Sequence, residues 1–191
     1  MTRAVVVPSA LLLLPEYAGR VDPAPELRSA CLAAVGWLIE DAPRRVLALV
    51  PPADPANVAR GVSTPLGRRV ADELLRRSGF AGDVVEDGPV DVHTAVLVVA
   101  DGSARRGEHA PGYLDDRAVA FDTSVEEALM LADSSALESL DIRLGAELLA
   151  QGVPALQRLG ALDLPVDQVD LDYAGDPFGV QYWVVRWHCA S

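Results

Sequence analysis

The fold of this chain is decided at residues 98–106, which read VVADGSARR. The β-branched, apolar start of the stretch is typical of a strand buried on both faces of a parallel sheet. At Asp101 the pattern changes to small, polar and charged residues. Open α/β folds bind their ligands at the edge where the carboxyl ends of such strands meet. The stretch therefore predicts an α/β fold whose binding edge begins at Asp101.

The rest of the sequence alternates between strand and helix patterns. Apolar runs at 4–7 and 46–50 each stop at a proline, which predicts two more buried strands. Helices are expected at 26–40, from the Ser63-Thr64-Pro65 start to Arg77, and at 125–131, 136–140, 142–149 and 154–159. Two closing strands are expected at 166–173 and 180–187, and they could pair as an edge hairpin. This order predicts one domain over residues 1–191, a three-layer αβα fold with a mostly parallel central sheet.

The charge of the chain excludes some functions. Acidic residues number 28 against 16 basic residues, all of them arginine, and the formal net charge is −12. Nucleic-acid binding depends on clustered cations, so no nucleic-acid partner is expected. No run reaches the roughly 18 apolar residues of a membrane span, so no membrane partner is expected either.

Two features bear on the compartment. Residues 3–14 imitate a short signal peptide, but Pro8 and Ser9 interrupt the apolar run, which favours a first core strand. Cys31 and Cys189 have neither a metal-type nor a redox-type spacing. A reduced, cytoplasmic setting is therefore expected.

Three strand ends gather residues that are typical of binding sites: Pro8-Ser9, the segment 51–54, and the segment 101–106. If the three strands are parallel neighbours, these ends meet and can line one pocket. Strand ends also need turn residues of these types, so these segments can equally be ordinary turns. The residues expected to line the pocket are Ser9, Asp54, Asp101, Ser103, Arg105 and Tyr113.

Other candidates for chemistry are few. His93, His109 and His188 have no partner at a spacing that specifies a metal site, and the spacing predicts no metal ligands. His109 is the best of them, because it follows the strand-end segment. Arg105 and Arg106 can either hold an anion beside glycine-rich backbone or pair with acidic neighbours in solvent.

Short segments of the chain are similar, in the same order, to motifs of one enzyme superfamily. They are 7–12 (VPSALL, similar to Pro-His-Pro-Pro-Leu), 49–52 (LVPP, where a strand ends in Ser-Pro-His), 100–105 (ADGSAR, similar to Gly-Asp-Leu-Ser-His-Arg), 110–113, 121–122, the helix around Glu147, and 177–182 (PFGVQY, similar to Pro-Tyr-Gly-Val-Gly-Tyr). By these segments the chain resembles the class III extradiol ring-cleavage dioxygenases, the LigB-like group that includes the catalytic subunit of protocatechuate dioxygenase and the Memo-like proteins.

The resemblance implies an iron site at which the family's histidines are replaced by other residues. In that family two histidines and a glutamate hold iron(II), and a further histidine acts as acid and base. Here Ser9, Pro52 and Ala104 stand at the histidine positions, and Glu147 stands at the carboxylate position. Proline and alanine offer no side-chain lone pair, and a serine hydroxyl is a poor substitute for imidazole. No cofactor is therefore expected.

The resemblance then implies a non-catalytic or diverged protein that binds a small molecule in the residual pocket or acts through a protein partner. One alternative is an active metal-dependent, extradiol-type oxidoreductase with displaced ligands such as His93 or His109, or a metal-free hydrolase-like activity. Another is a subunit that pairs with a catalytic homologue. Family members are often oligomeric, so the resemblance also implies a homo-oligomer or association with another protein.

Overall fold

One mixed sheet organises residues 2–17, 19, 21–53, 55–62 and 64–190, which are the residues that the computed structural model describes. The strand order in this part of the chain is β3-β2-β4-β1-β6-β5. The strands are β1 (Arg3–Val7), β2 (Arg45–Leu49), β3 (Asp83–Val85), β4 (Thr94–Val99), β5 (Val166–Gly175) and β6 (Tyr182–Cys189). Strands β1 to β4 pair in parallel, whereas β6 is antiparallel to both of its neighbours.

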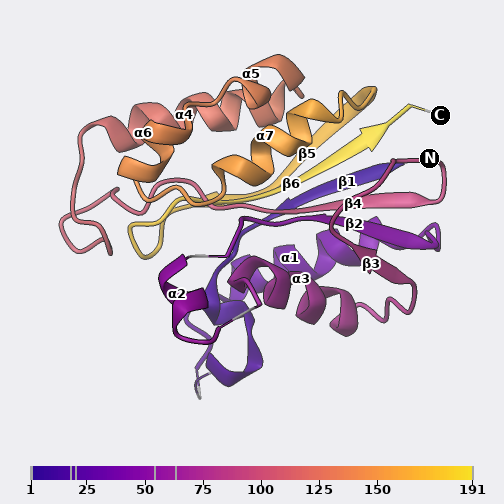
Figure 1. Cartoon of the computed structure of the whole chain (residues 1–191), viewed down its shortest axis with the longest axis horizontal. Coiled ribbons are helices and arrows are strands. Elements are labelled where there is room, and N and C mark those ends of the chain that lie inside the picture. The colour runs from indigo at the N-terminus through magenta and orange to yellow at the C-terminus, as the bar shows by residue number, and fades with distance from the viewer. Residues whose placement is uncertain (1, 18, 20, 54, 63, 191) are drawn as a thin grey trace.

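Helices cover both faces of this sheet, which confirms the expected three-layer α/β architecture (Figure 1). Helices α1 and α3 lie on one face, and α4, α5, α6 and α7 lie on the other. Their bounds are α1 (Pro25–Leu38), α2 (Pro55–Ala59), α3 (Leu66–Arg77), α4 (Arg117–Met130), α5 (Ser134–Glu138), α6 (Ile142–Glu147) and α7 (Val153–Ala161). Two 3₁₀ turns, Leu11–Leu13 and Pro15–Tyr17, follow β1.

The core has two halves, because successive side chains of a strand point to opposite faces. In β1, Val5 and Val7 pack in the half under α1 and α3, whereas Ala4 and Val6 pack in the half under α4 to α7. All four are buried. A strand enclosed on both faces needs apolar residues at every position, which explains the continuous apolar runs of the sequence.

The register brings three strand ends to one edge. Val7 at the end of β1 pairs with Val99 at the end of β4, and Leu49 at the end of β2 pairs with Val98. Because β2, β4 and β1 are parallel neighbours, the segments that follow them leave the sheet side by side. In Figure 1, α2 and α6 lie at this end of the sheet, and the chain termini lie at the opposite end.

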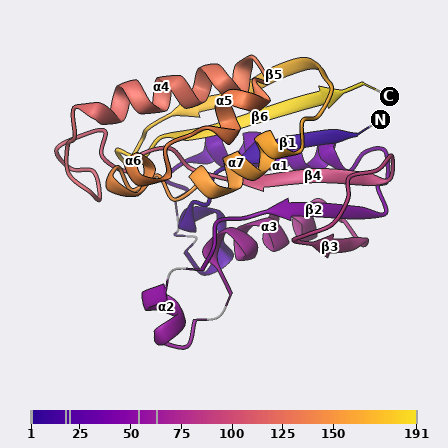
Figure 2. The ribbon, with the colours of Figure 1, turned by 45° about the horizontal axis from the view of Figure 1, so that its top comes forward.

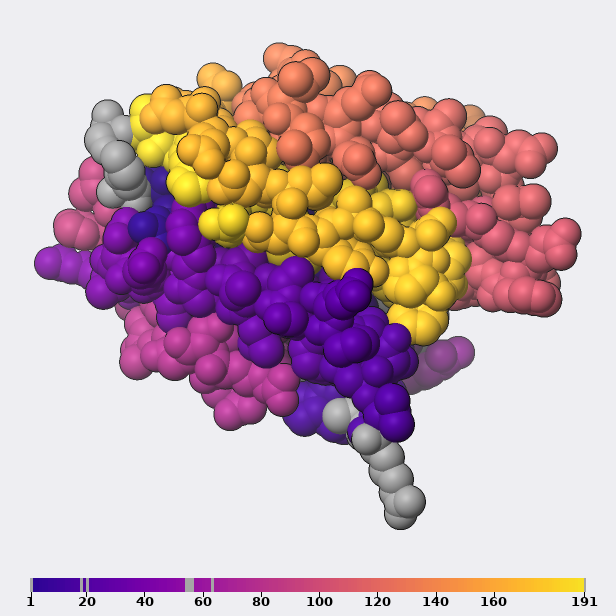
Figure 3. All heavy atoms as spheres, turned by 180° about the vertical axis from the view of Figure 1, so that it is seen from behind, coloured from indigo at the N-terminus to yellow at the C-terminus, as the bar shows by residue number. Residues whose placement is uncertain are grey.

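The expected edge hairpin is present in β5 and β6, and Figure 3 shows the two strands as a band across the back of the molecule. The outer strand β5 is interrupted by two register shifts and carries Asp167, Asp170 and Asp172. Bulges and charges on an edge strand oppose pairing with another sheet. This edge is therefore protected against such pairing.

Several elements differ from the sequence expectation, among them the short helix α2, which was not expected. Strand β3 was not expected, because its three residues are only partly buried and carry too short a pattern. Helix α4 begins at Arg117 rather than at 125, because the buried Asp122 breaks the apolar periodicity of its first turns. Helix α3 begins at Leu66 with Pro65 as its N-cap and no side-chain cap, so Thr64 does not cap it; Ser63 lies outside the described residues.

A search of the described helices finds none with the length and apolar character that crossing a bilayer requires.

Candidate functional site

A two-lobed cleft, here called the edge cleft, lies at the carboxyl ends of the central strands. Its polar lobe has a volume of about 340 Å³, and the side chains with polar atoms that line it belong to Ser9, Tyr17, Asn57, Thr64, Arg69 and Gln151. Its apolar lobe has a volume of about 250 Å³ and is lined by Ile142, Ala146, Ala150, Val153 and Pro154. Both lobes share Pro51, Pro52, Ala53 and Gln151, so they are contiguous.

Local sequence explains why the cleft forms there. Pro51 and Pro52 end β2, since proline cannot donate to a sheet ladder. Gly67 lets the first turn of α3 approach this strand end closely, because a Cβ at Gly67 would lie 2.9 Å from Pro51 Cδ. On the other side, Figure 2 shows α2 standing off from the body of the molecule. The chain after β2 therefore leaves the sheet and returns around the polar lobe.

Ser9 and Asp101 form a polar pair at this edge, joined by two hydrogen bonds. The backbone N–H of Ser9 donates to Asp101 Oδ1 at 2.7 Å, and the Ser9 hydroxyl donates to Asp101 Oδ2. The pairing of β1 with β4 places the two residues side by side, two positions beyond the register pair Val7–Val99. Ser9 lines the polar lobe, whereas the partly buried Asp101 contacts Ser9 without lining the lobe itself.

The Asp101 carboxylate is held without a cation. No arginine or histidine within the described ranges forms an ion pair with it. Desolvation by the surrounding protein raises the pKa of Asp101 to about 6, and the two hydrogen bonds from Ser9 oppose that rise. Asp101 is thus ionised at neutral pH, but at a cost in free energy.

Asp101→Asn is therefore expected to raise the free energy of unfolding by about 1 kcal/mol at pH 7.5. Because the folded-state pKa lies above the ordinary value of 3.8, the stability from this group is present below that value and lost as the pH rises through about 6. The asparagine side chain does not titrate, so the variant does not lose this stability. The difference in free energy of unfolding between the variant and the wild type should therefore grow from pH 4.5 to pH 7.5. Urea unfolding at each pH measures it, with the exposed Asp116→Asn as control. A variant less stable than the wild type at pH 7.5 would contradict this argument.

Ser103, two residues further on, is turned away from the cleft. It is fully buried, and both its backbone N–H and its hydroxyl donate to Asp122, at 2.7 and 2.6 Å. Arg106 completes this cluster by pairing with Asp122 at 3.1 Å and with Asp176 at 2.7 Å. The expectation that Ser103 lines the pocket is thus not met, because α4 offers its hydroxyl a buried carboxylate partner. Arg106 was expected either to hold an anion or to pair with acidic neighbours, and the structure shows ion pairing.

The remaining pocket candidates also lie elsewhere. Tyr113 is 76% exposed with a positive φ of 59°, and it lines neither lobe. Arg105 packs against Gly112, and its buried Nε has no hydrogen-bond partner in the described structure. Asp54 lies outside the described residues. Of the six residues expected at the pocket, the structure brings together Ser9 and Asp101.

The family's metal positions do not converge on one point. Pro52 lines both lobes, whereas Ala104 is buried and bonded through its backbone to Leu148 and Gly112. Glu147 is exposed and forms ion pairs with Arg117 at 2.8 Å and with Arg143 at 3.2 Å. The hydrogen bond from Arg117 is the main reason why the pKa of Glu147 is lowered.

These residues do not fit an iron(II) ion. The hydroxyl proton of Ser9 is committed to Asp101, Pro52 and Ala104 have no donor atom, and Glu147 is committed to two guanidinium groups. An iron(II) site of this type needs two imidazoles and a carboxylate on one face. The part of the chain that the structure describes contains no group of three His, Cys, Asp or Glu side chains that could hold a metal ion.

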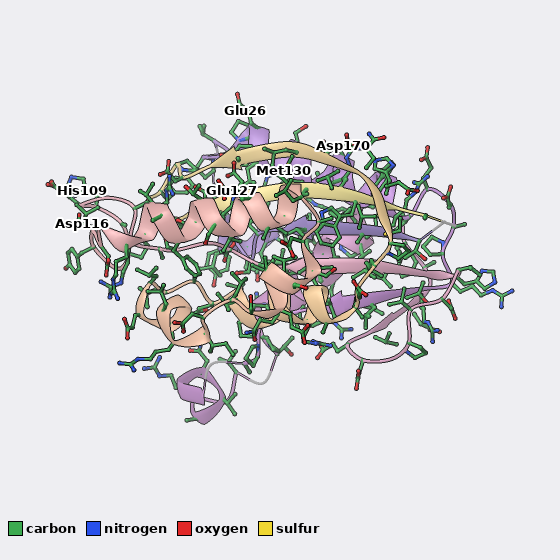
Figure 4. All side chains as sticks on the ribbon, turned by 90° about the horizontal axis from the view of Figure 1, so that it is seen from above. Glu26, His109, Asp116, Glu127, Met130 and Asp170 are labelled. Carbon is green, nitrogen blue, oxygen red and sulfur yellow. The ribbon has the colours of Figure 1, made fainter. Side chains whose placement is uncertain are left out.

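The three histidines do not share a site. His93 precedes β4 at its amino end, and His188 faces Arg3 at the amino end of β1, so both lie at the edge opposite the cleft. The His188 ring pairs through Nε2 with Asp170 Oδ2 at 2.8 Å, and its centroid lies 4.6 Å from that of the Trp37 ring, which is tilted by 53°. Figure 4 shows His109 pointing outward from the loop before α4. None of the three lines either lobe.

Sequence reasoning missed most of the polar side chains of the cleft. Asn57, Thr64 and Arg69 come from the long connection after β2 and from α3, and Gln151 precedes α7. A signal was available in the length of the connection after Pro52, since long loops at the carboxyl edge often carry binding residues. Its composition, however, does not single out any one residue.

Comparisons with known proteins assign no function to the site. No protein-family model matches the chain, and a search of the curated proteins finds no match.

Proposed function

We propose that this protein binds a small molecule in the edge cleft and does not cleave aromatic rings with iron. The observation that carries this proposal is the contiguity of the polar and apolar lobes at the ends of β1, β2 and β4. Small-molecule sites typically have volumes of about 300–1,000 Å³, mostly apolar walls and a few placed polar groups. The cleft combines these properties, and open α/β sheets bind ligands at this edge.

The extradiol oxidoreductase remains the competing proposal. It requires imidazoles that reach the cleft, and His93 and His188 lie at the opposite edge, while His109 lines neither lobe. The hydrolase-like alternative would use Ser9 as nucleophile, but its hydroxyl is paired with a carboxylate rather than with an imidazole. Histidine is the usual base for a serine nucleophile because its pKa is near neutrality. The structure therefore favours binding over either reaction.

Two further parts of the proposal concern setting and partners. We place the protein in the cytoplasm, because Cys31 and Cys189 are both buried free thiols, as is usual in a reducing compartment. Association with a second copy or with another protein remains a prediction of the family resemblance.

The binding proposal predicts that filling the apolar lobe abolishes binding there. Ala146 is an exposed residue of α6 that lines this lobe, so Ala146→Phe can occupy it without disturbing the core. Fragments that shift the amide resonances of the cleft are expected to bind at least about tenfold more weakly to the variant. The measurement is an ¹H–¹⁵N NMR titration of a set of aromatic and aliphatic fragments.

The matched control is Ala120→Phe, which places the same side chain at an exposed position of α4 that lines neither lobe. Fragment affinities are expected to be unchanged in this variant. A separate assay adds iron(II) anaerobically and then a panel of catechols with dioxygen. Stoichiometric iron together with a ring-opened product would overturn the proposal in favour of the oxidoreductase.

A further inference from the structure

The Ser9 side chain gives the polar lobe a hydrogen-bond acceptor rather than a donor. A serine hydroxyl has one proton and two lone pairs. That proton is committed to Asp101 Oδ2, and the backbone N–H of Ser9 is committed to Asp101 Oδ1. A ligand that reaches Ser9 Oγ from the cavity therefore meets its lone pairs and not its proton. A ligand group meets this atom favourably only if it donates.

The carboxylate behind Ser9 makes this acceptor negative. The described residues give Asp101 no ion-pair partner. The titratable side chains near it, Cys31 and Tyr182, are both neutral at pH 7.5, because burial raises the pKa of Cys31 to about 12 and also raises the pKa of Tyr182. Arg69 lines the same lobe, but Glu16 pairs with it. The charge of Asp101 thus has no local compensation.

We propose that the edge cleft takes a primary amine, whose ammonium group donates to Ser9 Oγ while its apolar body packs on Pro51 and Pro52. This inference rests on the proposed function, since it names the ligand class of the same cleft. A cation is favoured over a neutral donor because it offsets the unpaired charge of Asp101, and charge-assisted hydrogen bonds are stronger than neutral ones. The two prolines line both lobes and supply the apolar contact.

Three probes of nearly equal shape test the inference at pH 7.5: phenethylamine, 2-phenylethanol and phenylacetate. They present a cationic donor, a neutral hydroxyl and an anionic acceptor. Titration of the ¹⁵N-labelled protein, followed through the amides around Ser9 and Gln151, gives each affinity and its location. Phenethylamine is expected to bind about tenfold more tightly than 2-phenylethanol, and phenylacetate is expected to bind most weakly.

Two variants separate the charge from the acceptor. Asp101→Asn is expected to reduce phenethylamine affinity about tenfold, to the level of 2-phenylethanol, and to leave the alcohol nearly unchanged. Ser9→Ala is expected to weaken both donors. Asp116→Asn removes the same charge at an exposed residue that lines neither lobe, so it controls for attraction by the net charge of −12. It is expected to change no affinity.

The outcomes distinguish the amine inference from the binding proposal. If phenylacetate binds as tightly as phenethylamine, or if Asp101→Asn leaves the amine unaffected, the amine inference is overturned. The cleft proposal survives that result as long as Ala146→Phe still abolishes fragment binding. If phenethylamine shifts no cleft amide at millimolar concentration, the amine inference also fails. The wider fragment set then decides the cleft proposal by itself.

Discussion

Asp122→Ala is expected to lower the free energy of unfolding by about 3–5 kcal/mol. The side chain is 2% exposed and accepts hydrogen bonds from the Ser103 backbone, the Ser103 hydroxyl and Arg106. Its removal leaves the buried donors of Ser103 without partners and one side of the Arg106 guanidinium uncompensated. Buried donors that lose their acceptor cost far more than the bond itself contributes.

Chemical denaturation at pH 7.5 measures this loss, and two variants calibrate it. Asp122→Asn keeps the volume and one acceptor oxygen, so it is expected to lose less than the alanine variant. Asp176→Ala removes the other, more exposed partner of Arg106 and is expected to cost less than about 1 kcal/mol. Equal losses from Asp122→Ala and Asp176→Ala would show that the cluster does not anchor the loop after β4.

Gly152→Ala is expected to cost about 3 kcal/mol, although the backbone of Gly152 suits any residue, with a φ of −71°. A Cβ at Gly152 would lie 2.6 Å from the backbone nitrogen of Asp101 and 2.7 Å from Ala100 Cα. Neither atom belongs to a flexible side chain, so the clash must move α7 away from the end of β4. Gln151 and Val153 line the cleft on either side of this residue, so fragment binding should weaken as well.

The matched control for this substitution is Gly36→Ala in α1. A Cβ there meets no atom within 4 Å, and alanine has the higher helix propensity. Gly36→Ala is expected to stabilise the protein by about 0.5–1 kcal/mol. Thermal unfolding of both variants gives the comparison. If Gly152→Ala were as harmless as Gly36→Ala, the close contact between α7 and β4 would not be a constraint on the fold.

Sequence patterns were sufficient for the layers and for the sheet edge at which the cleft lies. The continuous apolar runs that became β1, β2 and β4 predict strands covered on both faces, and their final residues predict where those strands stop. Ser9 and Asp101 were expected at a common edge for this reason, and the structure joins them by two hydrogen bonds. Local signals of this kind depend on residues that are close in the chain.

Local sequence patterns could not predict which side chains from distant segments become partners. Asp101 and Ser103 are equally polar and lie two residues apart, yet one bonds to Ser9 and the other to Asp122. The sequence places Glu147 on a helix, but its two arginine partners could not be known from its neighbours alone. The alternation of strand side chains sends such neighbours to different surroundings, and those surroundings are built by other elements.

By itself the sequence determined an αβα sandwich with a mostly parallel sheet and the edge at which β1, β2 and β4 end together, because burial on both faces requires continuous apolar strands. Only the tertiary structure decided what this edge contains. It placed Asn57, Thr64, Arg69 and Gln151 around Ser9, and it left Asp101 without a cation. The physical reason is that contacts between segments far apart in the chain depend on packing, which no local pattern of residues encodes.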